Sequence, residues 1–329
     1  MKSIHSLIEK AAVVLDGKPL DKGLAMEMSG LRGNDIPDLI ALAHKVRLKY
    51  SPGIHICTIL NAKSGQCPED CRYCAQSLHA DTEIETYPLM SPDTILTAAG
   101  RAYSNGADCF GIVTSGYGYT EADGEFRDIL AAADKIHARY PSLDVGASMG
   151  ILSGTTARLL AEHGIRHYNH NLQVNPSKYG ELVATTHTVE ERIETLRLLK
   201  RNGIRVCSGG ILGLGETMDD RVELAYALRD AGADIIPLNV LVPIQGTALE
   251  KSPSPTVMET AKTFAIFRLV NPHAVIKFAA GRETVMKDFQ GLLMLAGVNG
   301  FLTGGYLTTR GRSVEEDVRF INEMRGFIN

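Results

Sequence analysis

Three cysteines stand close together in the first quarter of the chain. Cys67, Cys71 and Cys74 fall within eight residues, with three residues between the first two and two between the last two. Ferredoxin runs have four cysteines, and zinc sites usually combine a C-x₂-C pair with a distant second pair, so neither template fits. A loop with three thiolates can hold three corners of a 4Fe–4S cluster and leave the fourth iron open. Half of a zinc site, or three unrelated buried thiols, are the alternatives.

The composition is that of an ordinary globular protein. The 329 residues are 44% hydrophobic and 22% charged, with a formal net charge of −4 and no basic stripe, which argues against nucleic acid or an anionic membrane as partner. No apolar run approaches the ~20 residues that a membrane span requires. Residues 1–18 lack the apolar core of a signal peptide. Six cysteines without an export signal predict a cytoplasmic protein whose thiols are ligands rather than disulfides.

Short apolar runs alternate with amphipathic segments through most of the chain. The predicted strands are 54–60, 109–114, 144–148, 167–171, 205–211, 234–241, 275–278 and 300–302. The predicted helices between them are 92–105, 125–140, 157–163, 189–202, 219–231 and 256–270. Eight such units indicate an α/β fold, and the count favours a closed TIM-type (β/α)₈ barrel over an open sheet.

A helical extension is expected before the barrel. Apolar residues recur at helical spacing over 4–12 and again over 39–46, where Asp35-Ile36-Pro37 is expected to open the second helix. One domain is predicted, with N-terminal helices over 1–50, the barrel and its site over 53–310, and a C-terminal helix over 311–329. The cysteine loop follows the first strand, so it lies at the carboxyl rim, where such barrels carry their active sites.

The cysteine loop resembles that of radical S-adenosylmethionine enzymes, and further stretches narrow the resemblance to the biotin synthase family. These stretches are Tyr168-Asn169-His170-Asn171, Thr185-Thr186-His187-Thr188, Cys207-Ser208-Gly209-Gly210, Pro237-Leu238-Asn239, Ala280-Gly281-Arg282-Glu283 and Leu307-Thr308-Thr309. The resemblance runs from about residue 53 to residue 310. It implies a 4Fe–4S cluster on the three loop cysteines, with S-adenosylmethionine at the open iron as the source of a 5′-deoxyadenosyl radical.

The same resemblance implies the reaction and the partners. The family inserts sulfur between C6 and C9 of dethiobiotin, and a second, auxiliary iron–sulfur cluster supplies the sulfur. An electron donor such as flavodoxin or ferredoxin and a homodimer are also implied. Related radical enzymes are an alternative, namely the mutase of pyrrolysine synthesis or the hydrogenase maturase. These would not be expected to keep Asn239 with Thr308-Thr309 and two interior cysteines. A scaffold or electron carrier without a substrate is the other alternative, although a carrier has no use for a substrate-sized polar rim and would ordinarily bind all four irons through cysteine.

Single residues receive roles from the resemblance. Tyr73 and Ile211 are expected to face the adenine, Arg192 the carboxylate and Gln173 the ribose of the cofactor, where the family has an aspartate in place of Gln173. Asn171, which is also expected near the cofactor, and Asn239 are predicted at the reacting end of the substrate. The remaining substrate residues are predicted to be Asn169, Thr308 and Thr309. Taken singly, such asparagines are more often turn residues, such threonines helix caps and such an arginine a solvated charge. We expect packing or hydrogen-bonding roles, rather than metal ligation, for His55, His167 and His170.

The sequence departs from the family at the auxiliary cluster, which usually has three cysteines and an arginine. Cys109 and Cys207 match two of the cysteines, but the third aligns with Gly146 and the arginine with Lys277. Cys57 is an additional thiol, on the first predicted strand, where typical members carry serine. We therefore expect Cys57, Cys109 and Cys207 to hold a cubane with an exchangeable fourth iron in place of the 2Fe–2S cluster. The alternative is that Cys57 is only a small buried apolar residue.

Overall fold

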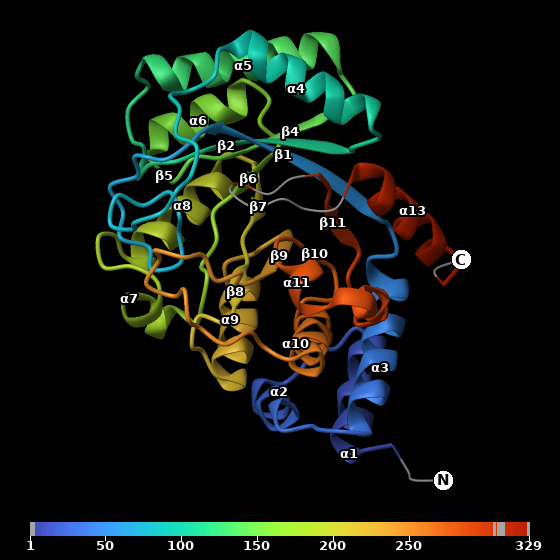
Figure 1. The fold of residues 1–329 in the computed structure, drawn as a ribbon. Coiled ribbons are helices and arrows are strands. Elements are labelled where there is room, and N and C mark those ends of the chain that lie inside the picture. Colours follow the sequence, from blue (N-terminus) through green and yellow to red (C-terminus); the bar gives the residue numbers. More distant parts are fainter. Residues whose placement is uncertain (1–3, 305–306, 308–312, 328–329) are drawn as a thin grey trace.

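The computed structural model describes residues 4–304, 307 and 313–327, and Figure 1 shows parallel strands surrounded by helices. The eight barrel strands are β1 (His55–Lys63), β2 (Cys109–Thr114), β4 (Asp144–Ser148), β6 (His167–Asn169), β7 (Arg205–Cys207), β9 (Ile235–Val240), β10 (Val275–Phe278) and β11 (Gly300–Leu302). Each pairs in parallel with its neighbours, and β11 pairs with β1 as well as with β10, which closes the ring. The predicted barrel is confirmed.

Two predicted strands end earlier than expected. The run 167–171 stops at Asn169, and the run 205–211 breaks after Cys207 and resumes as β8 (Gly210–Leu212), which pairs with β9. Gly209 lies in the break, where a Cβ atom would come within 1.8 Å of the Pro237 carbonyl oxygen. This close approach depends on a distant strand, so periodicity alone does not predict it. A separate two-stranded sheet joins β3 (Gly118–Tyr119) to β5 (Ile151–Leu152).

Helices cover the outside of the barrel. The six that the sequence predicts are α4 (Pro92–Ser104), α5 (Gly124–Arg139), α6 (Gly154–Glu162), α8 (Val189–Arg201), α9 (Met218–Asp230) and α10 (Val257–Val270). Each begins after a Ser, Thr or Asp whose side chain accepts a hydrogen bond from the first turn, as helix N-caps do. Shorter elements lie in the loops: η2 (Pro176–Lys178), α7 (Tyr179–Leu182), α11 (Arg282–Val285), η3 (Lys287–Phe289) and α12 (Gln290–Leu295).

Both ends of the described chain are helical. The N-terminal part holds α1 (Ser6–Ala11), η1 (Ala12–Asp16), α2 (Lys22–Ser29) and α3 (Asp35–Tyr50), of which α2 was not predicted. The second predicted helix starts at Asp35 as expected, but Asp35 lies in its first turn, and the capping residue Asn34 makes no side-chain cap bond. At the other end, α13 (Val314–Arg325) is held by Arg282, which donates to Asp317 at 2.6 Å with both side chains buried.

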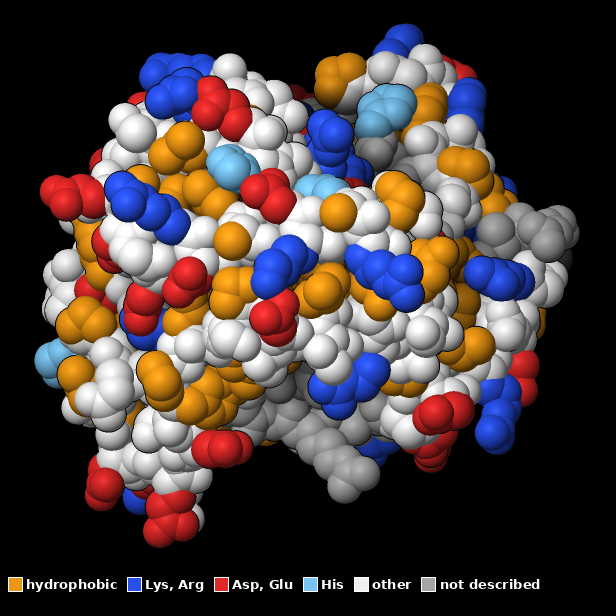
Figure 2. Space-filling view, turned by 90° about the horizontal axis from the view of Figure 1, so that it is seen from above, with side chains coloured by type: hydrophobic (Ala, Val, Ile, Leu, Met, Phe, Trp, Pro, Cys, Tyr) orange, Lys and Arg blue, Asp and Glu red, His pale blue; other side chains and the backbone are white. Residues whose placement is uncertain are grey.

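The main apolar core lies between the strands and the surrounding helices. Its largest fully buried aromatic side chains are Tyr168, Tyr179, Phe110, Phe126, Phe264, Phe267 and Phe278. A second, smaller cluster consists of Cys57, Cys109, Ala279 and Leu302. Among the described residues, no helix is long and apolar enough to cross a membrane. Figure 2 shows acidic and basic side chains interspersed over one face of the molecule.

Candidate active site

One cavity of about 390 Å³ opens at the carboxyl ends of the barrel strands. All six cysteines line it. The other predicted site residues that line it are Tyr73, Asn169, Asn171, Gln173, Arg192, Ile211 and Asn239. Thr308 and Thr309 lie outside the described residues. The structure therefore brings together every predicted site residue that it describes, from strands and loops far apart in the sequence.

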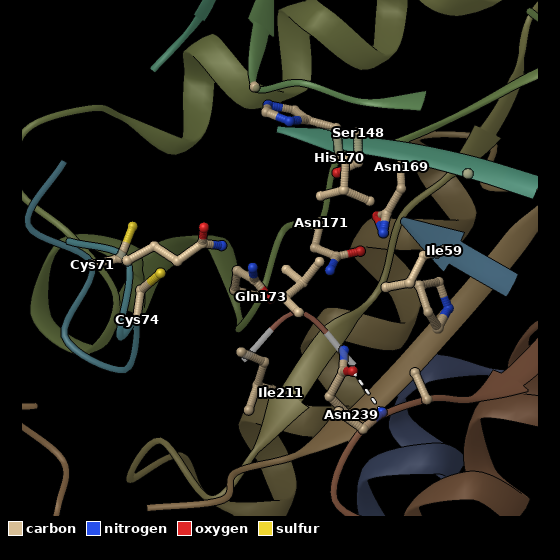
Figure 3. Close-up of a pocket in the computed structure, with 18 of the residues that line it drawn as sticks. Ile59, Cys71, Cys74, Ser148, Asn169, His170, Asn171, Gln173, Ile211 and Asn239 are labelled. Carbon is tan, nitrogen blue, oxygen red and sulfur yellow. Dashed lines mark hydrogen bonds between the residues drawn. The ribbon is translucent and has the colours of Figure 1, made fainter. Parts of the chain in front are cut away.

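The cysteine loop presents its thiols to this cavity. Figure 3 shows Cys71 and Cys74 on one side of the pocket. Burial raises the pKa of the Cys71 thiol to about 12, and the nearby Cys74 and Cys67 sulfurs add to the effect. Burial likewise raises the pKa of Cys67 and of Cys74. The positive charges of Arg192 and Lys63 act in the opposite direction on Cys71 and Cys67 but do not outweigh burial. Iron ions would supply the positive charge that the thiolates need, so this donor set fits a 4Fe–4S cluster.

The alternative to a cluster is a site that would bind a single metal ion. Within the described part of the chain, no three His, Cys, Asp or Glu side chains converge closely enough to hold one ion. Cluster ligands bind different irons and so lie farther apart than the ligands of one ion. Among the described residues the loop thiols therefore do not form a preformed site for one ion, which agrees with a cluster.

Two acidic residues between the loop cysteines anchor the loop to the segment before α8. Glu69 accepts hydrogen bonds from His187 Nδ1 at 2.5 Å and from Thr186 Oγ1 at 2.6 Å. Asp70 accepts from the backbone N–H and the hydroxyl of Thr185, both within 2.8 Å. Burial tends to raise the pKa of the Asp70 carboxyl, but hydrogen bonds from Thr185 and Thr186 outweigh it and hold that pKa well below its usual range. These contacts were not predicted from the sequence, although both segments belong to the motifs that carry the family resemblance.

The residues predicted at the cofactor are tied to one another. Gln173 Nε2 donates to the Tyr73 hydroxyl at 2.7 Å, and its backbone has a positive φ of 69°. Arg192 Nε donates to the Asn171 carbonyl at 2.6 Å, while its Nη1 lies 3.3 Å from His187 Nε2. These two contacts fix the orientation of the guanidinium at the cavity wall.

Several buried polar atoms face the cavity without a partner among the described residues. Among them are Asn169 Oδ1, His170 Nε2 and Gln173 Oε1. Burial lowers the pKa of His170 well below its usual value, so its imidazole is neutral near pH 7. Buried polar groups of native proteins nearly always have partners, so unpaired atoms on a cavity wall indicate a ligand with polar groups.

The two remaining predicted asparagines already make hydrogen bonds. Asn239 Oδ1 accepts from the backbone N–H of Ala280 at 3.0 Å, and its Nδ2 donates to the Gly210 carbonyl at 3.3 Å. Asn171 Oδ1 accepts from the Gly209 N–H at 3.0 Å. Figure 3 shows Asn169, Asn171 and Asn239 across the pocket from Cys71 and Cys74.

The other three thiols lie deeper inside the barrel. Cys57 and Cys109 are register partners on β1 and β2, and Cys207 ends β7. A hydrogen bond from Cys109 and the charge of Lys277 outweigh burial and lower the pKa of the Cys57 thiol well below its usual value. Lys277 Nζ lies 2.9 Å from Cys57 Sγ. The inward position predicted for Cys57 is confirmed, and three thiols around one ammonium group form a donor set that fits an iron–sulfur cluster.

His167 also belongs to this group, which sequence analysis did not expect. Its Nε2 lies 3.2 Å from Cys109 Sγ, and the ring lines the cavity beside the thiols. The signal available in the sequence was its place directly before the Tyr-Asn-His-Asn stretch, at a strand position that faces inward.

Two family models match the chain. The Radical SAM superfamily matches residues 61–228, and the Biotin and Thiamin Synthesis associated domain matches residues 237–326. Among solved structures, methylornithine synthase aligns with a TM-score of 0.81 at 17% identity over 97% of this chain and 96% of its own. The hydrogenase maturase HydG of Carboxydothermus hydrogenoformans has the same TM-score at 16% identity, covering 97% of this chain and 78% of its own. At these identities the likeness shows the fold alone.

Curated relatives are much closer in sequence. Biotin synthase of Chlorobium luteolum is 54% identical over 326 residues, which cover 98% of each chain. Biotin synthase of Chlorobaculum tepidum is 53% identical over 332 residues, covering 99% of this chain and all of its own. Members of this family use a 4Fe–4S cluster, S-adenosylmethionine and an auxiliary iron–sulfur cluster. The chain belongs to the biotin synthase family of radical S-adenosylmethionine enzymes.

Proposed function

We propose that the protein inserts sulfur between C6 and C9 of dethiobiotin and so forms biotin. The observation that carries the proposal is that two sets of three cysteines line one cavity, one set at its rim and one deep in the barrel. Cys57 and Lys63 are six residues apart on β1, roughly 20 Å of strand. The loop cysteines follow the carboxyl end of this strand, so the two sets would lie at different depths of the cavity, with a cofactor and a substrate between them.

Cys67, Cys71 and Cys74 would hold the first cluster, which together with S-adenosylmethionine supplies a 5′-deoxyadenosyl radical. Tyr73 and Ile211 offer apolar surface to the adenine. The N–H groups of Arg192 that are not already hydrogen-bonded pair with the cofactor's carboxylate. Gln173 Oε1 accepts a hydrogen bond from a ribose hydroxyl, and Asn171 adds its amide N–H. These roles are supported by the shared cavity and by the unpaired Gln173 oxygen.

The substrate would lie between the two sets of thiols. Asn169 presents an unpaired amide oxygen that suits an N–H of the ureido ring, and the Nδ2 groups of Asn171 and Asn239 suit its carbonyl. Thr308 and Thr309 remain proposed ligands of the substrate carboxylate, on the strength of the family resemblance alone. The apolar wall of Ile59 and Leu302 suits the methylene chain.

Cys57, Cys109 and Cys207 would hold the auxiliary cluster as a cubane with an exchangeable fourth iron. Gly146 has no ligating atom, so the usual four-ligand 2Fe–2S site cannot be built from the aligned positions. Burial alone would lower the pKa of the Lys277 ammonium, but Cys57, Cys207 and Cys109 raise it above its usual value. Lys277 is thus a counter-charge to the thiolates rather than a ligand.

The test is to incubate reconstituted protein with S-adenosylmethionine, a reductant and dethiobiotin, and to look for biotin by mass spectrometry. Biotin together with 5′-deoxyadenosine supports the proposal. Cofactor cleavage without biotin would favour a related mutase or maturase, and no cleavage at all would favour an electron carrier. Replacing Cys71 by alanine should abolish 5′-deoxyadenosine formation. We also propose a cytoplasmic homodimer served by a flavodoxin- or ferredoxin-type donor, which size-exclusion chromatography and reconstitution with either donor can check.

A further inference from the structure

The imidazole of His167 occupies the space that a side chain at position 146 would need. Gly146 and His167 are register partners on β4 and β6. A Cβ atom on Gly146 would lie 2.1 Å from His167 Nε2 and 2.4 Å from its Cε1. Real Cβ atoms do not approach other atoms so closely, so the ring can lie here only because residue 146 is glycine.

The position of the ring nitrogen matches the missing ligand. His167 Nε2 is 2.1 Å from the Cβ position of residue 146, close to the distance that separates the sulfur of a cysteine from its own Cβ. The same nitrogen is 3.2 Å from Cys109 Sγ. We therefore interpret the two features together: Gly146 replaces the family cysteine, and the imidazole nitrogen of His167 replaces its sulfur as a donor.

The other ring nitrogen has a carboxylate behind it. His167 Nδ1 lies 3.6 Å from Asp144 Oδ2, which also accepts a hydrogen bond from Arg205 Nη2. Neither Nδ1 nor Asp144 Oδ1 has a hydrogen-bond partner among the described residues. A carboxylate behind a metal-binding histidine normally keeps the distal nitrogen protonated and leaves the other nitrogen's lone pair for the metal. A small shift of the ring toward Asp144 would complete this arrangement, with Nε2 directed at the thiols.

We propose that His167 Nε2 is the fourth protein ligand of the auxiliary cluster, with Asp144 as its positioning residue. The inference rests on the proposed function, because that function calls for the cluster. Lys277 is a poorer candidate, since its single nitrogen already donates a hydrogen bond to Cys57 Sγ at 2.9 Å. A neutral imidazole also suits an exchangeable fourth iron better than a fourth thiolate, and replacing thiolate by imidazole raises the reduction potential of a cluster.

The decisive measurement is pulsed EPR of the reconstituted, reduced full-length protein without S-adenosylmethionine. With ¹⁵N-labelled histidine, the cluster signal should show a strong nitrogen coupling that changes with the isotope and vanishes in His167→Gln. His163→Gln removes an imidazole that is bonded to Asp134 on the helical layer, so it should leave the coupling unchanged. Wild-type protein without a histidine coupling would overturn the ligation while biotin formation, assayed separately, still decides the proposed function.

Two further variants test the proposal in case His167→Gln does not fold. Gly146→Ala keeps the imidazole but forces it away from its place, so the nitrogen coupling should fall sharply. Gly146→Cys combined with His167→Ala returns sulfur to that corner. The double variant should keep its iron, lose the nitrogen coupling and show a lower reduction potential than wild type. An unchanged potential in an iron-loaded double variant would overturn the proposal, as would an unchanged coupling in Gly146→Ala.

Discussion

The ammonium group of Lys277 lies 2.9 Å from the sulfur of Cys57, inside the barrel and away from solvent. The relationship is mutual, because the thiol raises the pKa of the lysine and the lysine helps to lower that of the thiol. A buried charge without a partner is costly, so each group depends on the other. With the hydrogen bond from Cys109, the lysine therefore favours the ionised form of Cys57, in which cysteine binds iron.

The first prediction concerns Cys57→Ser, which removes the sulfur at almost constant volume. Fully reconstituted wild type should bind about eight irons, the number for two cubanes, and the variant about four. Biotin formation should be lost, whereas 5′-deoxyadenosine formation at the loop cluster should largely survive. Iron analysis and product assays on the same preparations measure both quantities.

Cys71→Ser is the matched control, because it should show the reverse pattern with cofactor cleavage abolished and the deep cluster retained. A Cys57→Ser protein that keeps both its iron and its sulfur insertion would leave Cys57 as a packing residue. Cys57 would then not be the thiol that compensates for the missing family cysteine at position 146.

The barrel could be predicted from the sequence because its strands are covered on both sides. Such strands form short apolar runs, and Gly and helix caps mark the turns between them. The break between β7 and β8 could not be predicted from the sequence, because it depends on how close Pro237 of β9 comes to Gly209. Helix α2 escaped prediction because it is only eight residues long and buries few side chains, among them Ala25 and Met28.

Some features of the site could likewise be predicted from the sequence, and others could not. Residue type identified the six thiols, and the rule that parallel barrels work at their carboxyl rim placed the loop. Contacts between segments that are distant in the sequence could not be predicted. The bond from Glu69 to His187 spans 118 positions, and the fit of His167 over Gly146 depends on the register of β4 with β6. Neither is visible until the strands are aligned.

Asp70 should stabilise the protein in a pH-dependent manner. Its pKa in the folded protein lies below the unfolded value of about 3.9, so its contribution is complete above about pH 4 and is lost as pH falls through the folded pKa. Asp70→Asn should therefore cost about 1–2 kcal/mol of unfolding free energy at pH 7. Urea unfolding of cluster-free protein at pH 7, 4 and 3 should show the gap to wild type narrowing below pH 4.

Asp128→Asn, on the exposed face of α5, is the comparison for Asp70. Its difference from wild type should stay small and constant over the same pH values. A gap for Asp70→Asn that does not change with pH would mean that the hydrogen bonds to Thr185 and Thr186 do not depend on the charge.

Gln173 should contribute to cofactor binding through its unpaired oxygen. Gln173→Leu removes that acceptor and the bond to the Tyr73 hydroxyl, so a ribose hydroxyl loses its partner. The expected cost is about 1–2 kcal/mol, which is roughly a tenfold weaker affinity for S-adenosylmethionine in equilibrium binding. Gln173→Asp, which restores the family residue and keeps an acceptor, should bind at least as well as wild type. Equal affinity of the leucine variant would place the ribose elsewhere.

Asn239 offers the sharpest separation between a structural and a substrate-binding role. Its Oδ1 accepts the shorter hydrogen bond, from Ala280, while the 3.3 Å contact of Nδ2 with Gly210 is weak enough to be exchanged for a substrate carbonyl. Asn239→Asp keeps the acceptor for Ala280 but replaces the donor by a second oxygen. Dethiobiotin affinity should fall by about 1–3 kcal/mol, because a ureido carbonyl would then face an acceptor in place of a donor.

The thermal midpoint and the rate of S-adenosylmethionine cleavage should remain near wild type in Asn239→Asp, since the bond to Ala280 survives. Asn239→Ala breaks both bonds, so it should lower the thermal midpoint as well as the affinity. The two variants together distinguish the roles. If the aspartate variant binds dethiobiotin as wild type does and only the alanine variant is impaired, Asn239 joins β9 to the segment after β10 and does not touch the substrate.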